Sequence, residues 1–530
     1  MQRTRGVAAR LVAWAGVAAA VGALAVGEVA ALLVDRRSSP VVAVGGLVID
    51  RVPPAGKELA IQLFGTNDKL ALVVGSVLFV CLAGAALAIA ARDNGWIGLA
   101  GFGLLGALAM VAAVTRAGAT AAWALPGLLA AGAGMAVLTW LLSLVGVGAV
   151  AGGTNRTAAE GPDAEGDWPP DGEPVSGATR RRFLRTSGTL IGAGAVVSLV
   201  AHRFGQFSST NAAREAVRTS LPEPSGGPAP SIPAADVADL HYETPNAEFY
   251  RIDTALVVPR VDPADWTLTI DGLVSRPITL TFEELLRRPM IERYITLTCV
   301  SNEVGGDLIG NARWLGVPVK ALLEEAGPAP DADQVVSWSV DGFTAGTPTA
   351  ALLDGRDALI AVGMNGEPLP LDHGFPVRMV VPGLYGYVSA TKWLRRLELT
   401  RFADFDAYWV PRGWAQQAPI KTQSRIDRPR AGSTISAGTY LVAGVAWAQH
   451  RGISAVQVRV DGGAWQDATL AAVASIDTWR LWSWSWPATP GTHVLEVRAA
   501  DNAGVPQTEA RAAPAPDGAT GYHAITVTVR

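Results

Sequence analysis

Four long apolar segments near the N-terminus set the strongest limit on what this chain can fold into. They are rich in Ala, Val, Leu and Gly, and they run from Leu11 to Val34, Leu70 to Ala91, Trp96 to Val114 and Ala121 to Ala151. Each is close to or longer than the about 20 apolar residues that a membrane-spanning helix needs. The sequence therefore predicts a four-helix transmembrane region over residues 1–151 and a multi-pass protein of the plasma membrane.

The composition of these segments limits what they can carry. They contain no histidine, so they cannot supply the paired imidazoles of a membrane haem b. The chain has two cysteines, Cys81 and Cys299, and no C-x-x-C pattern, so we expect neither haem nor an iron–sulfur cluster in it. A net charge of −4 gives no reason to expect nucleic acid as a partner. We interpret the helices as an anchor or docking platform.

A polar linker and an arginine-rich motif follow. Residues 152–178 are rich in Gly, Pro, Asp and Glu without periodicity, which indicates a solvated linker. The motif Thr179-Arg-Arg-Arg-Phe-Leu-Arg185 then precedes the apolar run Leu190 to Ala201. It resembles a twin-arginine export signal in an internal position, although a basic anchor before a fifth helix would look similar. We expect a cytoplasmic linker with the motif over 152–187 and a fifth transmembrane or signal helix over 188–204.

The position of the motif predicts the topology. A twin-arginine signal is read from the cytoplasm, so four preceding spans place the N-terminus there too, and the fifth helix delivers the rest of the chain to the outside. The basic residues of Met1–Arg10 and Arg180–Arg185 agree with the positive-inside rule, whereas those of the loop from Asp35 to Lys69 do not. We expect an extracytoplasmic tether over 205–235, with all later domains on that face.

Residues 236–410 predict an α+β domain. A Thr281-x-x-Glu284 capping box introduces one of its helices. The elements lack the regularity of βαβ units, and no Gly-x-Gly-x-x-Gly opens a helix, so a nicotinamide site has no support. The expected strands are Trp266–Ile270, Ile278–Leu280, Ile291–Leu297 and Val335–Val340, and the expected helices are Phe282–Arg287 and Val319–Ala326.

Residues 425–530 predict a second, all-β domain. Strands with period two are separated by turns, and both Asp461-Gly-Gly463 and Pro490-Gly491 are typical of hairpins. An immunoglobulin-like β-sandwich fits this pattern. The expected strands are Leu441–Ala446, Ala455–Val460, Arg480–Trp486, Val494–Ala499 and Ala524–Val529.

Cys299 is the candidate for chemistry in the α+β domain. As the single cysteine of a region predicted outside the cytoplasm, it cannot form a disulfide within its domain. The residues Tyr294 to Thr298 before it read as a strand, and Gly305, Gly306 and Gly310 after it suit a loop whose backbone approaches another group closely. Cys299 is therefore either a small buried hydrophobe or a thiolate ligand of a soft metal, and composition alone does not decide between them.

Three separated stretches resemble the molybdopterin-binding domain of the sulfite oxidase family. They are Cys299 to Leu323, Phe249 to Gly272, and Met364 to Arg378 with the later Val381-Pro-Gly383 and Lys392-Trp-Leu394. The resemblance implies a molybdenum ion bound by the dithiolene sulfurs of a pterin and by Cys299, and an oxygen-atom transfer. It implies catalytic roles for Cys299, Arg251 and Asp253. It implies cofactor contacts at Phe249, Tyr250, Arg251, Asp253, Cys299, Asp341, His373, Arg378, Ser389 and Lys392.

The donor set agrees with what an anionic cofactor needs. A pterin with a phosphate requires cations and hydroxyl or imidazole donors, and Arg makes planar bidentate contacts with phosphate. Arg378 lies within an otherwise apolar strand from Phe375 to Val381, where an unpaired guanidinium would cost several kcal/mol. We therefore expect Arg378 to have an anionic partner.

Departures from the family pattern bear on the substrate. Where sulfite oxidases follow the cysteine with basic residues, this chain has Val300-Ser-Asn-Glu-Val304, and Asp253 replaces a family histidine. Such a loss of positive charge should weaken the binding of sulfite.

Two functions fit the sequence. One is an extracytoplasmic molybdenum oxidoreductase that acts on a small or protein-bound oxide or oxyanion and exchanges electrons with a separate carrier or a quinone. The resemblance also implies a homodimer through the C-terminal domain. The other is a non-catalytic, membrane-anchored binding protein that retains the fold.

Overall fold

The computed structural model describes residues 2–52, 68–92, 94–144, 177–204, 209–225 and 236–530, and the single residues 56, 63, 227, 229 and 232. The chain forms two compact units. One comprises Met1–Ser208 with Ala255–Val257 and is helical, and the other comprises Ser209–Thr254 with Val258–Arg530. Most of the predicted linker, residues 145–151 of the fourth predicted span and part of the tether fall outside the described residues.

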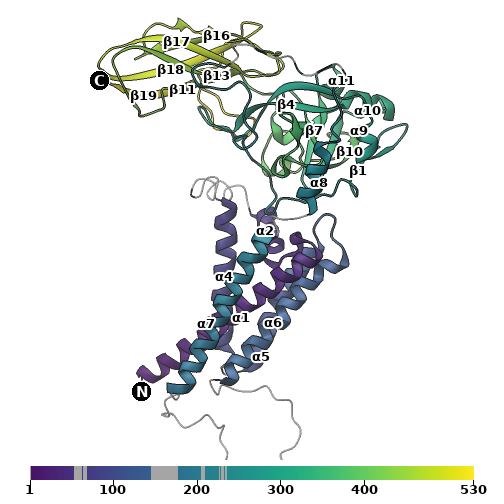
Figure 1. The fold of residues 1–530 in the computed structure, drawn as a ribbon, viewed down its shortest axis with the longest axis vertical. Coiled ribbons are helices and arrows are strands. Elements are labelled where there is room, and N and C mark those ends of the chain that lie inside the picture. The colour runs from purple at the N-terminus through teal and green to yellow at the C-terminus, as the bar shows by residue number, and fades with distance from the viewer. Residues whose placement is uncertain are drawn as a thin grey trace, which may run out of the picture. The chain divides into compact units, whose positions relative to one another are not determined.

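The helical unit contains the predicted spans (Figure 1). Four of its helical segments are long and apolar enough to cross a membrane: Arg10–Val34, Lys69–Ala90, Gly95–Val114 and Ala121–Leu144. Each begins within one residue of the prediction. The described helices are α1 (Gln2–Val34), α2 (Pro40–Arg51), α4 (Asp68–Ala90), α5 (Gly95–Val114), α6 (Leu125–Leu144, after the 3-10 turn Ala121–Ala124) and α7 (Gly177–Phe204).

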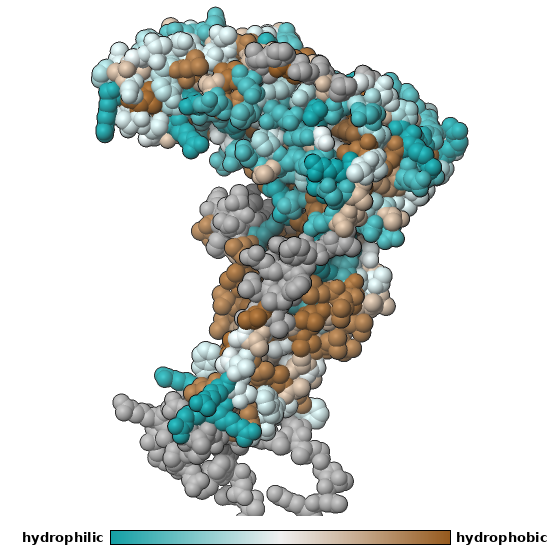
Figure 2. Space-filling view, viewed as in Figure 1, coloured by the Kyte–Doolittle hydropathy of each residue, from teal (hydrophilic) through white to brown (hydrophobic). Residues whose placement is uncertain are grey.

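The surface of this unit suits a lipid environment. Large apolar side chains point outward from α4 and α5, among them Phe79 at 65% and Leu104 at 72% exposure, and Figure 2 shows hydrophobic residues gathered over these helices. Inside the unit, α1 and α4 approach through Gly16 and Gly84, where a Cβ on Gly16 would lie 2.1 Å from the Gly84 carbonyl oxygen. Small residues allow such close contact between helix backbones in a membrane.

The arginine motif lies within α7. The helix begins at Gly177, upstream of the predicted start at residue 188, and within it the hydroxyls of Thr186 and Ser187 donate to the carbonyls of Arg182 and Phe183. It packs against α1, with Phe183 buried and Arg181 exposed. Among the described helices, α7 is not one of the four that are long and apolar enough to span.

The α+β domain is built on two sheets and confirms the predicted fold class. Two of its 3-10 turns are Leu371–His373, which contains the predicted cofactor contact His373, and Gly386–Val388, which directly precedes the predicted contact Ser389. The capping box also forms, since Glu284 Oε2 accepts from the Thr281 amide at 2.8 Å. One sheet has the order β2 (Ile278–Thr281), β1 (Thr267–Gly272), β10 (Leu394–Thr400), β5 (Gln334–Ser339) and β6 (Thr344–Pro348), with β1 and β10 parallel. The other has the order β3 (Ile291–Thr298), β4 (Ile309–Pro318), β7 (Leu359–Met364) and β8 (Glu367–Pro368), with β9 (Arg378–Val380) also on β7. The helices are α8 (Ser209–Arg218), α9 (Phe282–Leu286), α10 (Val319–Ala326) and α11 (Thr349–Leu353).

Strand β4 corrects one prediction. The sequence placed Gly305, Gly306 and Gly310 in a single loop, but the loop ends at Leu308 and Gly310 lies within β4. A Cβ on Gly310 would lie 2.7 Å from a ring carbon of Phe249. The glycine is therefore needed for the packing of an aromatic ring on the strand and not for a turn.

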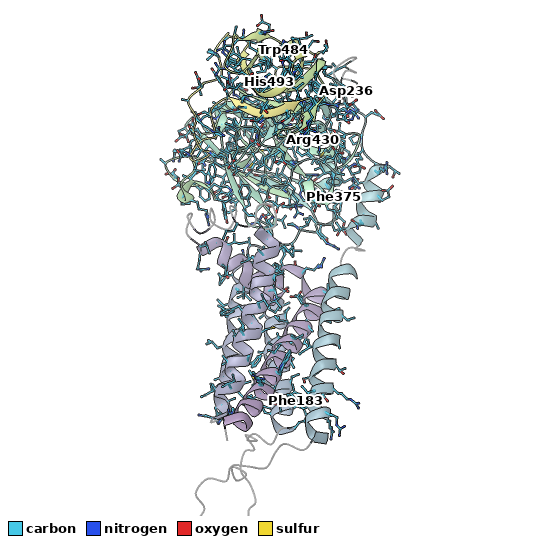
Figure 3. The ribbon with its side chains drawn as sticks, turned by 90° about the vertical axis from the view of Figure 1, so that its left-hand side faces the viewer. Phe183, Asp236, Phe375, Arg430, Trp484 and His493 are labelled. Carbon is cyan, nitrogen blue, oxygen red and sulfur yellow. The ribbon has the colours of Figure 1, made fainter. Side chains whose placement is uncertain are left out.

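The C-terminal domain is the predicted β-sandwich, and each of the five expected strands is present. Trp484 on β17 and His493 on β18 are labelled in Figure 3. One sheet has the order β11 (Gln423–Arg428), β13 (Gly438–Trp447), β17 (Arg480–Ala488) and β16 (Thr469–Leu470). The other has the order β12 (Thr434–Ile435), β19 (His523–Val529), β18 (Gly491–Asp501), β14 (Ile453–Val460) and β15 (Gln466–Asp467).

The two predicted hairpins have different outcomes. The turn at Asp461 joins the antiparallel strands β14 and β15 as expected. The hairpin at Pro490-Gly491 is wrong, because β17 and β18 belong to different sheets. The chain crosses the sandwich at this point, which lets consecutive apolar strands cover the core from both sides.

The sandwich shares a core with the α+β domain. Trp447 and Trp479 belong to the same buried cluster as Trp314 and Ile295. The Trp479 indole donates to the Tyr242 carbonyl at 2.9 Å, and the Tyr242 hydroxyl donates to Thr478 Oγ1 at 2.7 Å. The two domains therefore pack as one unit.

His523 in this interface predicts a pH dependence of stability. Its Nδ1 accepts from the Ile426 amide at 3.0 Å, and burial together with Arg425 and Arg511 lowers the His523 pKa to about 4. In the unfolded chain a histidine has a pKa of about 6.5, so unfolding takes up a proton between these values. The stabilisation from neutral His523 is complete above about pH 6.5 and is lost as pH falls toward 4.

Between pH 7 and pH 5, the unfolding free energy of the wild type should fall by about 2 kcal/mol more than that of a His523→Gln variant. Chemical denaturation of the full chain in detergent, followed by tryptophan fluorescence, would measure this. His241→Gln is the control, because the His241 side chain is 66% exposed. Equal pH dependence in the His523→Gln variant and the wild type would contradict the assignment.

Candidate active site

A cavity in the α+β domain contains most of the predicted site residues. It encloses about 910 Å³, part of it open to solvent. The lining residues include Phe249, Tyr250, Asp253, Cys299, Asp341, His373, Arg378 and Lys392 from the predicted set.

Cys299 stands at the point where β3 ends and its loop begins. Its amide donates to the Leu308 carbonyl at 2.9 Å, and its carbonyl accepts from the Asn302 amide at 3.1 Å, which closes the loop at both ends. The side chain lines the cavity at 8% exposure. Burial raises the pKa of the Cys299 thiol, so the thiol stays protonated until a metal displaces the proton.

A metal at Cys299 would need ligands from outside the chain. Across the described residues, no group of three His, Cys, Asp or Glu side chains converges in a way that could hold a metal ion. A single thiolate is a soft ligand and does not complete a coordination sphere alone. The site therefore suits a metal that arrives with a sulfur-bearing cofactor.

Phe249 and His373 form one wall of the cavity. The Phe249 ring packs at 5.2 Å on Tyr250 and edge-on at 5.6 Å to His373. His373 Nε2 lies 3.1 Å from the Asn246 carbonyl oxygen and must carry a proton there, because a carbonyl only accepts. Burial and the neighbouring Arg378 lower the His373 pKa to about 4, so the imidazole is neutral at pH 7. Its Nδ1 is then an acceptor.

Arg378 provides the test of cofactor fit. Its guanidinium donates to the carbonyls of His373 at 3.1 Å and Ala390 at 3.3 Å, and it lies 4.9 Å from the Trp314 ring centroid. Burial lowers the Arg378 pKa to about 10, so it remains a cation at neutral pH. Its Nε is a buried donor with no acceptor in the described part of the chain. An anionic group in the cavity would satisfy both the charge and this donor.

Asp253 and Lys392 form a buried ion pair beside the cavity. Lys392 Nζ lies 2.6 Å from Asp253 Oδ2 and 2.9 Å from the Asp372 carbonyl oxygen, and the two paired side chains are 8% and 4% exposed. Burial lowers the Lys392 pKa to about 8 despite the adjacent carboxylate. Burial also raises the pKa of the nearby Asp341 carboxyl. Burial therefore favours the uncharged form of both Lys392 and Asp341.

Arg251 does not line this cavity. Its side chain is 37% exposed and pairs with Asp253 at 3.0 Å and Asp372 at 3.5 Å. It lines an adjoining, more polar cavity that shares Phe249 and His373 with the first and also contains Arg214. The structure thus places Arg251, predicted as a catalytic and cofactor-contacting residue, in the cavity next to the one that contains Cys299.

Ser389 also lies outside the cavity lining. Its hydroxyl is fully buried and donates to the carbonyls of Leu384 and Tyr385, each at 3.0 Å. These bonds hold the turn that carries Tyr387 into the cavity wall.

Sequence reasoning missed an aromatic wall of the same cavity. Tyr387 and Trp414 pack at 5.8 Å between ring centroids, and Trp409 lies 6.3 Å from Trp414. Phe343 completes the wall. The signal was present as a cluster of aromatic residues between 408 and 414, but local sequence does not show that these rings face the Cys299 loop.

Comparison with known proteins agrees with this geometry. Residues 255–409 match the family described as oxidoreductase molybdopterin binding domain. A sulfite oxidase of Gallus gallus is 30% identical over 316 residues, which cover 50% of this chain and 67% of the relative. An uncharacterized oxidoreductase of Bacillus subtilis is 35% identical over 153 residues, which cover 29% of this chain and 74% of the relative.

A solved structure is also similar. The sulfane dehydrogenase of Paracoccus pantotrophus shows 25% identity and a TM-score of 0.48, covering 56% of this chain and 86% of that one. The chain spans 54 to 65% of the length of the mammalian sulfite oxidases that it matches.

The fold, the cavity at Cys299 and the sequence matches define a molybdopterin-binding oxidoreductase. The chain belongs to the sulfite oxidase family and is an enzyme of that family. The residues present fit the molybdenum–pterin cofactor that such a domain implies: Cys299 would bind the metal, and Arg378 and Lys392 would face its anionic groups. When bound, the cofactor supplies two-electron chemistry at the metal.

Proposed function

We propose that the protein is a membrane-anchored enzyme that removes an oxygen atom from a neutral oxide, such as a sulfoxide or N-oxide, on the extracytoplasmic face. The proposal is carried by one observation: Cys299 lines a cavity together with Arg378, whose buried Nε has no acceptor among the residues that the structure describes. A non-catalytic binding protein would have no use for a buried thiol and an unsatisfied donor around one cavity.

The charges of the cavity favour a neutral substrate. Arg378 and Lys392 are its two cationic lining residues, and both are engaged, Lys392 by Asp253 and Arg378 by two carbonyls and by the expected cofactor anion. Aromatic rings make up a large part of the remaining wall, which also includes the hydroxyl residues Ser301 and Ser339 and, as a further acid, Asp341. An oxyanion would meet no free cation among these residues, whereas a neutral oxide with apolar substituents can pack on the rings.

The proton donors fit the reductive direction. Reduction of an oxide takes two electrons and two protons and releases the oxygen as water. Asp341 Oδ1 accepts from the Phe343 amide at 3.1 Å, and burial raises the pKa of this carboxyl, which favours its protonated form. The Lys392 ammonium is the second source, because its lowered pKa makes proton release easier than from an ordinary lysine.

The location rests on two features. The four candidate spans make this a membrane protein, and the exposed Arg181 and Arg182 belong to the twin-arginine-like motif. That export route carries folded cargo, which suits a domain loaded with a pterin in the cytoplasm. We propose a separate electron carrier or a quinone as the reductant and a homodimer through the sandwich.

One experiment tests the activity and the face together. The full chain is produced in a host able to make the cofactor, and intact spheroplasts receive a membrane-impermeant dye. The dye is supplied reduced, as electron donor, with a sulfoxide or an N-oxide, and oxidised, as electron acceptor, with sulfite. We expect kcat/KM for a neutral oxide to exceed that for sulfite oxidation by about 10-fold or more, a difference of about 1.4 kcal/mol. Faster turnover of sulfite would contradict the substrate class, and activity only after lysis would contradict the proposed face.

A further inference from the structure

The strand that leads to Cys299 is held by the C-terminal sandwich. β3 is the edge strand of its sheet, so one side of its backbone is not paired with another strand of that sheet. The Gln449 side chain, two residues after β13, reaches this edge. Its Nε2 donates to the Thr296 carbonyl at 3.2 Å and to Thr298 Oγ1 at 2.9 Å. Thr298 immediately precedes Cys299.

A second segment of the sandwich completes the cover of this edge. The Thr296 amide donates to the Asp477 carbonyl at 3.0 Å, and the Trp479 amide donates to Thr296 Oγ1 at 2.7 Å. Gln449 is 1% exposed and Trp479 is 6% exposed. The end of the β3 edge is therefore covered by buried, directional bonds from another domain.

The loop after Cys299 is held from the same side. Arg425 donates to the Gly306 carbonyl at 2.6 Å. Gly305, at φ +80°, lies directly against His523, since a Cβ there would come 2.3 Å from a ring carbon of the histidine. Cys299 thus sits between two stretches of backbone that are both fixed by residues of the sandwich.

We propose that the sandwich positions the metal-binding cysteine and that Gln449 is the positioning residue. A ligand must be held within about 0.5 Å of its working place by groups whose own conformations are locked. Gln449 fits this role, because one amide group holds both the backbone and the side chain at the end of β3. This inference rests on the proposed function, because it takes Cys299 as the metal ligand. It goes beyond that function, because it gives the C-terminal domain a part in the site.

The test compares Gln449→Met with Gln457→Met, both in a Cys81→Ser background so that Cys299 is the single thiol. Methionine keeps the length of the side chain and removes the amide. Gln457 belongs to the same domain, but its amide donates to Asp467, away from β3. The first measurement uses full-length protein made without cofactor: the rate of Cys299 alkylation by iodoacetamide. We expect this rate to rise several-fold in Gln449→Met and to stay unchanged in Gln457→Met.

The second measurement uses the loaded enzyme. We expect Gln449→Met to lower kcat by about 10-fold, as loss of a partner that orients a metal ligand does, with KM unchanged. Its Mo(V) electron paramagnetic resonance signal should shift, which a purely structural loss would not cause. Should Gln449→Met fail to fold, Thr298→Val removes the acceptor of the same bond with little change in shape.

The outcomes separate the two proposals. Unchanged alkylation in a folded Gln449→Met or Thr298→Val variant overturns the positioning role, whatever the enzyme does. A wild-type protein that binds no molybdenum overturns the proposed function, while the alkylation rates still report whether Gln449 holds Cys299.

Discussion

A Cys299→Ser variant is expected to lose both its molybdenum and its turnover while keeping its fold. Serine has nearly the shape of cysteine, but its hydroxyl is a hard and weakly acidic group that does not replace a thiolate on a soft metal. Because no set of three potential ligands converges within the described residues, nothing else in that part of the chain can take its place. Metal analysis and dye-linked activity of protein purified from a cofactor-producing host would measure the loss.

Cys81→Ser is the matched control, since Cys81 lies on the apolar helix α4, far in sequence from the α+β domain. It should retain the metal, the activity and the melting temperature of the wild type. Full activity in Cys299→Ser would show that the thiolate assignment is wrong.

The second large effect concerns the buried pair of Asp253 and Lys392. Asp253→Asn leaves the Lys392 ammonium 8% exposed and without its carboxylate. Removing one partner of a buried ion pair costs about 3–5 kcal/mol, because the other charge stays buried. We expect the melting temperature to fall by about 10 °C, given a shift of about 2–4 °C per kcal/mol for a large domain. Calorimetry of the full chain in detergent would show it.

A double variant distinguishes the charge from the shape of the site. The Lys392 pKa falls to about 8 even beside the carboxylate, which means that burial costs this ammonium more than the pairing returns. Asp253→Asn combined with Lys392→Met should therefore recover most of the lost stability, since apolar replacement of a buried pair is often neutral. The single variant Asp253→Asn and the double variant should both bind the cofactor poorly. A double variant as unstable as Asp253→Asn alone would contradict this account.

Local patterns in the sequence were sufficient for several conclusions. Backbone groups in lipid must bond within their own helix, so the length of each apolar run predicts a span directly. Alternation with period two predicts strands, because neighbouring side chains point to opposite faces, and five strands of the sandwich followed from it. Cys299, His373, Arg378 and Lys392 were found by their motifs, and the structure brings them to one cavity.

Other features depend on contacts between segments that are distant in the chain. The motif assigned Arg251 a catalytic role together with Cys299, but it did not reveal that Arg251 pairs with Asp372 and lines a different cavity. The turn at Pro490 looked like a hairpin, because a turn signal does not say which sheet the next strand will join. In each case the deciding partner is supplied by the packing of the domain.

The sequence by itself determined that the chain has four apolar spans, an α+β domain with a candidate metal-binding thiol, and a β-sandwich. Only the tertiary structure decided what surrounds that thiol: the aromatic wall of Tyr387 and Trp414, the unsatisfied donor of Arg378, and the bond from Gln449 to Thr298 across 151 residues of chain. The physical reason is the distance along the chain over which each kind of signal acts. Periodicity and turn chemistry report on residues a few positions apart, whereas a site is made where separate segments converge on a shared core.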